Sequence, residues 1–66
     1  MRRYIIEVYN KNNNYFVGYL VANKTFTTST KYKEYCTKYK TWIFAKMECM
    51  HLLDIGYMHI YNIKHE

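Results

Sequence analysis

Proline is absent from this chain of 66 residues, and glycine and cysteine each occur only twice. Two cysteines fall far short of a disulfide framework, and we therefore expect free thiols and a reducing compartment. No glycine-rich loop is present to cradle a phosphate. No apolar run approaches the ~20 residues of a membrane span, and Glu7 and Asn10 interrupt what would be the apolar part of a signal peptide. These absences predict a soluble, cytoplasmic protein with no membrane partner.

Acidic residues are also scarce, since five Asp and Glu stand against ten Lys and Arg, for a net charge of +5. The excess is local, because residues 24–41 hold five lysines and one glutamate. Such a patch attracts nucleic acid or an acidic protein surface, and added salt weakens the attraction. The few acids form no recognisable catalytic pair, and Cys49 and His51 would diverge on a helix. We therefore expect no enzyme activity, no cofactor and no metal site.

The short length leaves room for one domain, residues 1–66. Below roughly 70–80 residues a single core rarely supplies more than about 3–5 kcal/mol, so small proteins often depend on disulfides, metals or a partner. Because cysteines and metal motifs are lacking, we expect a partner.

What the chain does contain is one segment with clear helix boundaries, residues 41–56. Thr41 can cap the N–H groups of a first turn, and Gly56 is a residue that commonly ends a helix. No proline or glycine lies between them, so the segment predicts a helix of about four turns.

Three segments alternate in the manner of half-buried strands: residues 3–10, 15–22 and 57–64. A polar KNNN run at 11–14 separates the first two and predicts an antiparallel hairpin. Gly18, in the middle of the second strand, predicts a bulge or a place where the helix lies close.

Residues 24–40 allow more than one interpretation. The stretch KTFTTST at 24–30 fits either a polar strand or a threonine-rich loop. After it, four residues recur at the i, i+3, i+4 and i+7 spacing of an amphipathic helix: Tyr32, Tyr35, Cys36 and Tyr39. This spacing predicts a short helix that runs into the turn before Thr41.

Together these elements predict an α+β fold in the order β-β-(short element)-α-β, a small antiparallel sheet with one main helix packed on one face. A right-handed crossover places the last strand beside the first, which becomes central. The other two strands are then edges unless residues 25–30 cover one. An uncovered edge can accept a strand from another chain.

The predicted helix carries two apolar stripes rather than one. The first stripe, assigned to the core, consists of Trp42, Ala45, Cys49, Leu52 and Leu53. The second consists of Ile43, Met47 and Met50. A single-layer sheet covers only one stripe, so the second is either covered by residues 24–40 or exposed as an adaptable surface for a homodimer or a foreign target.

Nine tyrosines are an unusual number for 66 residues. Strand alternation places five of them on the sheet face opposite the helix: Tyr9, Tyr15, Tyr19, Tyr57 and Tyr61. Tyrosine provides broad, stiff contact area that suits binding surfaces, but it is also a good strand former. We predict partner contacts for Tyr9, Tyr15, Tyr19 and Tyr61, in addition to the second helix stripe.

The interleaved run KYKEYCTKYK, residues 31–40, is the best candidate for contact with nucleic acid. Lysines would meet phosphate oxygens while tyrosines pack or stack. The candidate residues are Lys31, Tyr32, Lys33, Tyr35, Lys38, Tyr39 and Lys40. The run also fits a solvated basic face or contact with an acidic protein surface, and no RNP-type signature accompanies it.

The layout resembles that of small accessory proteins of phages with AT-rich genomes. The features that carry the resemblance are MRRYIIEVYN at the start, the KNNN turn, KYKT at the helix entrance with Ala45 and Leu52 after it, and the terminal MHIYNIKHE. Proteins of that kind include anti-CRISPR and other anti-defence inhibitors. The resemblance implies a non-catalytic inhibitor of a host or defence-system protein in the host cytoplasm, and it transfers no functional residue.

We therefore expect a protein that binds and occludes a host or defence-system protein. The alternative is a small basic nucleic-acid-binding regulator acting through residues 31–40, and a structural homodimer is a third interpretation. An inhibitor that mimics DNA would be acidic, so the net charge of +5 excludes mimicry.

Overall fold

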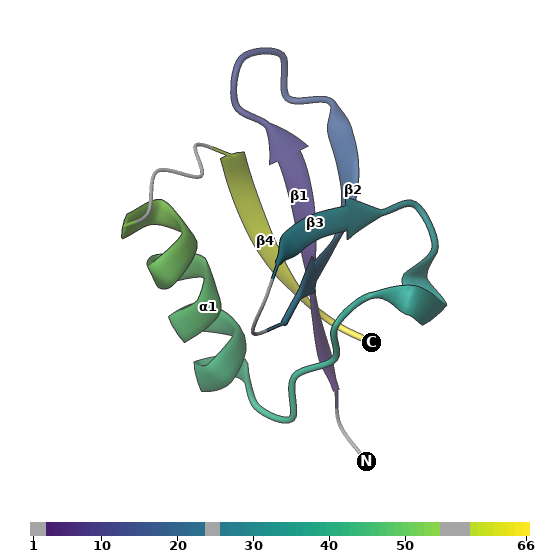
Figure 1. Cartoon of the computed structure of the whole chain (residues 1–66), viewed down its shortest axis with the longest axis vertical. Helices are drawn as coiled ribbons and strands as arrows, with labels where there is room; N and C mark the ends of the chain where they lie inside the picture. Colours follow the sequence, from purple (N-terminus) through teal and green to yellow (C-terminus); the bar gives the residue numbers. More distant parts are fainter. Residues whose placement is uncertain (1–2, 24–25, 55–58) are drawn as a thin grey trace.

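The computed structural model describes residues 3–23, 26–54 and 59–66, which form a four-stranded antiparallel sheet with one helix packed against it (Figure 1). The elements in chain order are β1 (Tyr4–Asn10), β2 (Phe16–Ala22), β3 (Thr27–Thr30), the 3-10 turn η1 (Lys33–Tyr35), α1 (Trp42–Asp54) and β4 (His59–His65). The strand order is β3-β2-β1-β4. This confirms the predicted α+β fold with β1 between β2 and β4, and it shows the threonine-rich segment to be an edge strand beside β2.

The β1–β2 hairpin closes through the predicted asparagine turn. The Asn10 side-chain oxygen accepts a hydrogen bond from the backbone N–H of Asn12 at 2.8 Å. Asn14 has a φ of 61°, and asparagine tolerates this left-handed conformation better than most residues. Asn10, just before the KNNN run, thus provides the side-chain acceptor, and Asn14 at the end of the run provides the reversal.

Gly18 lies at an irregularity in this hairpin. Val8 pairs with Gly18 but Tyr9 pairs with Phe16, so β2 bulges by one residue and the predicted bulge is confirmed. Gly18 has a φ of 155°, and a Cβ atom there would lie 2.8 Å from the carbonyl oxygen of Thr30. The close neighbour that requires glycine is therefore the backbone of β3, not the helix.

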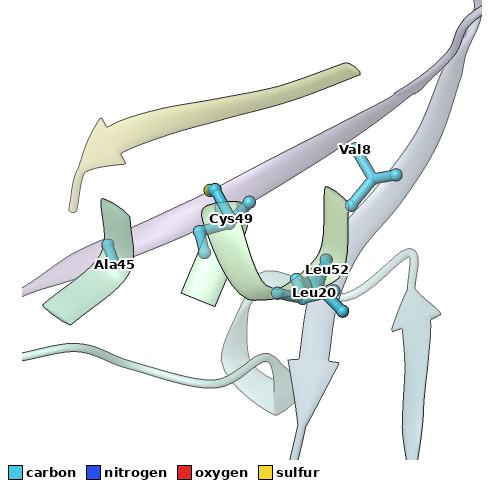
Figure 2. Close-up of a cluster of buried hydrophobic side chains, with 6 residues drawn as sticks. Val8, Leu20, Ala45, Cys49 and Leu52 are labelled. Atoms are coloured by element: carbon cyan, nitrogen blue, oxygen red, sulfur yellow. The ribbon is translucent and has the colours of Figure 1, made fainter. Parts of the chain in front are cut away.

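The core lies between α1 and one face of the sheet (Figure 2). It consists of Ile6, Val8, Leu20, Ala45, Cys49 and Leu52, all 6% exposed or less. Burial raises the pKa of the Cys49 thiol, which keeps it neutral and suits its place as a small apolar core residue.

The helix begins where Thr41 predicts, because the Thr41 hydroxyl accepts a hydrogen bond from the N–H of Phe44 at 3.3 Å. It extends to Asp54, and Gly56 lies outside the described residues. Trp42 and Leu53 were assigned to the core, and this was wrong, since they are 49% and 54% exposed. Positions 45, 49 and 52 fill the line of contact with the sheet, and positions 42 and 53 lie at its flank.

The predicted face of the last strand was also wrong. Tyr61 pairs with Val8 and Ile63 with Ile6, so both lie on the helix side of the sheet and pack against the core. Both alternating sets of this strand contain apolar residues, so alternation alone did not show which set faces the helix. Tyr57 lies outside the described residues.

The predicted helix around Tyr32–Tyr39 does not form beyond the short turn η1. β1 and β2 pair with each other only over Glu7–Tyr9 and Phe16–Tyr19. The start of β1 and the end of β2 instead form hydrogen bonds with the segment that follows η1. Tyr39 exchanges two backbone hydrogen bonds of 2.8 Å with Tyr4. The N–H of Thr37 donates to Leu20, and its hydroxyl bonds to both the N–H and the carbonyl of Ala22. Satisfying these sheet groups outweighs the weak preference of a short segment for helix.

Candidate protein-docking surface

The part of α1 that is not in contact with the sheet, from its flanks to the side that faces away, is largely apolar and open to solvent. Six large apolar side chains make up this outer face of α1: Trp42, Ile43, Phe44, Met47, Met50 and Leu53. The predicted stripe lies at its centre, with exposed fractions of 65% for Ile43, 58% for Met47 and 56% for Met50. Residues 24–40 therefore do not cover the stripe, and the alternative that they do is wrong.

The exposure follows from the composition of the helix. A helix that is apolar on all sides is normally buried on all sides. α1 instead packs on one face of the sheet (Figure 1), and only its side with Ala45, Cys49 and Leu52 is buried there. Lys46 and His51 are also exposed on the helix, and the ammonium of Lys46 lies 5.9 Å from the centre of the Trp42 ring. The outer face of α1 therefore has an apolar centre with a cation at its flank.

An open groove of about 460 Å³ adjoins the first half of the outer face of α1. Its lining joins two regions that are separate in sequence: Lys38, Tyr39 and Lys40 before the helix, and Phe44, Met47, Glu48 and His51 on it. Met47 is thus shared between the groove and the outer face. The structure brings the helix stripe together with the last three candidates of the basic run.

Tyr39 forms part of the groove wall without being free to stack on a base. It packs against the core, and its hydroxyl donates to a carboxylate oxygen of Glu48 at 3.4 Å. Burial, followed by the charge of Glu48 and this hydrogen bond, raises the pKa of Tyr39 well above its usual range. The neutral phenol of Tyr39 and the carboxylate of Glu48 therefore form one side of the groove.

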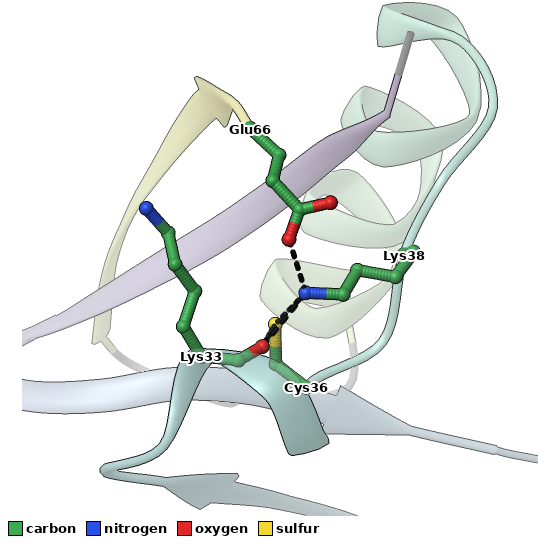
Figure 3. A network of polar contacts seen from close by, with 4 residues as sticks. All are labelled: Lys33, Cys36, Lys38 and Glu66. Carbon is green, nitrogen blue, oxygen red and sulfur yellow. Dashed lines mark hydrogen bonds and ion pairs between the residues drawn. The ribbon is translucent and has the colours of Figure 1, made fainter. Parts of the chain in front are cut away.

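Lys38 is held by the protein itself (Figure 3). Its ammonium donates to Glu66 at 2.5 Å and to the carbonyl oxygen of Lys33 at 2.7 Å, and it lies 3.6 Å from Cys36 Sγ. The hydrogen bond with Glu66 is the main cause that raises the pKa of Lys38 and lowers that of Glu66. Lys38 is a predicted contact for nucleic acid or an acidic protein surface, and in the structure its ammonium pairs with Glu66 and with the Lys33 carbonyl oxygen.

The first half of the basic run forms a separate exposed corner at η1. Its members are Lys31, Tyr32, Lys33 and Tyr35, and the two tyrosines are 62% and 69% exposed. Their rings meet edge-to-face with centres 5.9 Å apart. The predicted candidate surface therefore divides into this corner and the groove, with Lys40 on the groove side.

The predicted tyrosine face is reduced to a smaller aromatic cluster. Tyr9 and Tyr19 lie on the sheet face away from α1, and Phe16 lies between their rings with centre distances of 5.5 Å and 5.2 Å. The hydroxyl of Tyr9 donates to Glu7 at 2.9 Å, and this bond is the main cause that raises the pKa of Tyr9. Tyr15 stands in the turn before β2 and is 73% exposed. Tyr61, on the other face, does not belong to the cluster.

Besides Leu53, Phe44 and Trp42 are the residues on the outer face of α1 that the sequence did not identify as binding candidates. Phe44 shares the groove with Met47, and Trp42 adjoins Lys46. The signal for both was the count of apolar residues around the helix, which exceeds what one sheet can cover. Pattern alone could not divide them between flank and core.

Within residues 3–23, 26–54 and 59–66, no group of three or more His, Cys, Asp and Glu side chains is placed to hold a metal ion. None of the helices in those ranges is long and apolar enough to cross a membrane. Comparison with protein-family models, with curated proteins and with solved structures finds no match for this chain.

Proposed function

We propose that this protein is a non-catalytic binding protein that docks on another protein through the outer face of α1 and the adjoining groove. The observation that carries the proposal is the exposure of Ile43, Met47 and Met50 at more than half of their surface each. Soluble monomers rarely expose large contiguous apolar patches unless those patches bind something. Methionine side chains also adapt their shape to the surface they meet.

The charge around the patch indicates the chemistry of the target. Lys40 borders the groove and Lys46 flanks the helix, while the chain as a whole carries +5. An apolar surface edged with carboxylates would complement it. The specific form that we propose is inhibition by occlusion of a host or defence-system protein, which the resemblance to phage accessory proteins supports.

Affinity capture from a bacterial lysate, with and without nuclease, tests this proposal. We compare the wild type with the double variant Met47→Lys/Met50→Lys and with Tyr32→Lys/Tyr35→Lys as a control. Both variants add two positive charges and remove two exposed apolar side chains, but only the first alters α1. We expect a lysate protein that the wild type captures with and without nuclease and that the control variant captures equally well. The α1 variant should capture roughly tenfold less of it, or less still.

Two results would contradict the proposal. Capture that the α1 variant does not weaken would show that the outer face of α1 is not the binding surface. Capture that nuclease abolishes would show that nucleic acid, not protein, is the ligand.

A second candidate function is nucleic-acid binding by the corner at η1, where two lysines and two tyrosines are exposed together. Lysines there could neutralise phosphates while the tyrosine rings stack on unpaired bases. This candidate predicts a band shift with mixed DNA or RNA at low salt that disappears as salt rises. It also predicts that Tyr32→Ala/Tyr35→Ala, which removes the rings and leaves the charge unchanged, weakens the shift. No shift at low salt removes it.

A further inference from the structure

The size of the outer face of α1 indicates what covers it in the absence of a foreign target. A large apolar or aromatic side chain has on the order of 200 Å² of accessible surface, so six that expose about half present on the order of 600 Å². The six side chains of the outer face are 49% to 65% exposed. The largest patch on an ordinary monomer is about 300–600 Å², and a standard interface buries about 800 Å² per partner. The outer face of α1 thus lies at the upper end of the range for a monomer's largest patch, and with the groove beside it the surface approaches one half of such an interface.

We propose that in the free protein a second copy of this chain covers the outer face of α1, with the two helices packed against each other about a two-fold axis. The patch suits such a contact because its centre is self-complementary. Ile43, Met47 and Met50 lie on one side of a single helix, so in an antiparallel pair the first half of each helix meets the second half of the other.

The charges near the patch permit this contact and set its salt dependence. The ammonium of Lys46 lies over the Trp42 ring at the flank, so the lysine stem can cover apolar surface while the charge stays at the rim. Each copy carries +5, so two copies repel one another through water. Added salt screens this repulsion and strengthens self-association, whereas it weakens binding to an acidic target.

This inference does not rest on the proposed function, although both use the same surface. If both hold, a target and the second copy compete for the outer face of α1. A free protein that remains monomeric would overturn the inference and leave the docking proposal standing, and the lysate experiment can fail while self-association holds.

Sedimentation equilibrium across roughly a hundredfold range of protein concentration tests the inference. We expect the average mass to rise from the 8.2 kDa of one chain towards twice that value, more readily at high salt. The emission of Trp42, the one tryptophan in the chain, should shift to shorter wavelength over the same range, because the ring loses water at the contact.

The two double variants make this measurement specific. Met47→Lys/Met50→Lys should stay at the mass of one chain at every concentration, and Tyr32→Lys/Tyr35→Lys, with the same added charge, should associate like the wild type. A circular dichroism spectrum unchanged from the wild type shows that each variant is folded. A wild type that stays monomeric, an α1 variant that still associates, a control that does not, or a mass that climbs past the dimer each overturns the inference.

Discussion

Tyr39 illustrates how one residue can serve the fold and the surface at once. Its backbone pairs with Tyr4, the first residue of β1, and its ring packs against the core. Its hydroxyl donates to Glu48 in the groove. In the sequence it stands between two lysines and reads as a base-stacking candidate. The structure instead uses it to anchor the segment that leads into α1.

The raised pKa of Tyr39 predicts a loss of stability in alkali. The folded protein holds the phenol above its unfolded pKa of about 10, so this stabilisation is complete below that pH and is lost as pH rises past it. Between about pH 8 and pH 11, the free energy of unfolding of the wild type, measured with urea, should fall by about 1 kcal/mol more than that of Tyr39→Phe. One pH unit above the unfolded pKa corresponds to at most ~1.4 kcal/mol, and the partial exposure of the ring reduces this value.

The exposed Tyr32 supplies a control with the same chemical change. Tyr32→Phe should follow the wild type at every pH. Equal alkaline losses for the wild type and Tyr39→Phe would show that Tyr39 ionises as freely in the folded chain as in the unfolded one.

Secondary-structure elements with strong local signals could be predicted from the sequence. The Thr41 cap, the asparagine turn and the Gly18 bulge each depend on a residue with a distinct conformational or hydrogen-bonding preference, and each is present. Residues 31–40 carry no such signal. Only the turn η1 within them is helical, and the extended course of residues 37–39 depends on backbone groups of β1 and β2 that the sequence does not place beside them.

The candidate site was predictable to the same degree. The surplus of apolar residues on α1 identified Ile43, Met47 and Met50, which are exposed. The face occupied by Tyr61 and the internal pairing of Lys38 were not predictable, because the first depends on strand register and the second on a contact with Glu66, 28 residues away. Local pattern does not contain such long-range pairings.

The segment after η1 should contribute measurably to the stability of the sheet. The hydroxyl of Thr37 both accepts from the N–H of Ala22 at 2.8 Å and donates to its carbonyl at 3.2 Å. Thr37→Val keeps the shape but removes both bonds, so we expect a loss of about 1–3 kcal/mol in the free energy of unfolding, measured by urea denaturation.

Thr37→Ser keeps the hydroxyl and should lose much less than Thr37→Val. A valine variant as stable as the serine variant would mean that water replaces these bonds without cost. The link between the segment and β2 would then be a consequence of the fold and not one of its supports.

At the scale of the whole molecule, the structure combines a small core with a large apolar exterior. The buried cluster contains six side chains, and three of them are no larger than valine: Val8, Ala45 and Cys49. A core of this size rarely supplies more than about 3–5 kcal/mol. Covering the outer face of α1 would therefore contribute to folding as well as to binding, since a contact made only by the folded chain stabilises it.

Thermal unfolding should consequently depend on protein concentration. When most chains are paired, a tenfold rise in concentration stabilises the pair by about 1.4 kcal/mol, or about 0.7 kcal/mol per chain. For a domain of this size that raises the melting temperature by about 3–5 °C, which circular dichroism can follow. Met47→Lys/Met50→Lys should melt at a temperature independent of concentration, whereas Tyr32→Lys/Tyr35→Lys should show the wild-type dependence. A wild-type midpoint that stays constant with concentration would mean that the core between α1 and the sheet supports the fold alone.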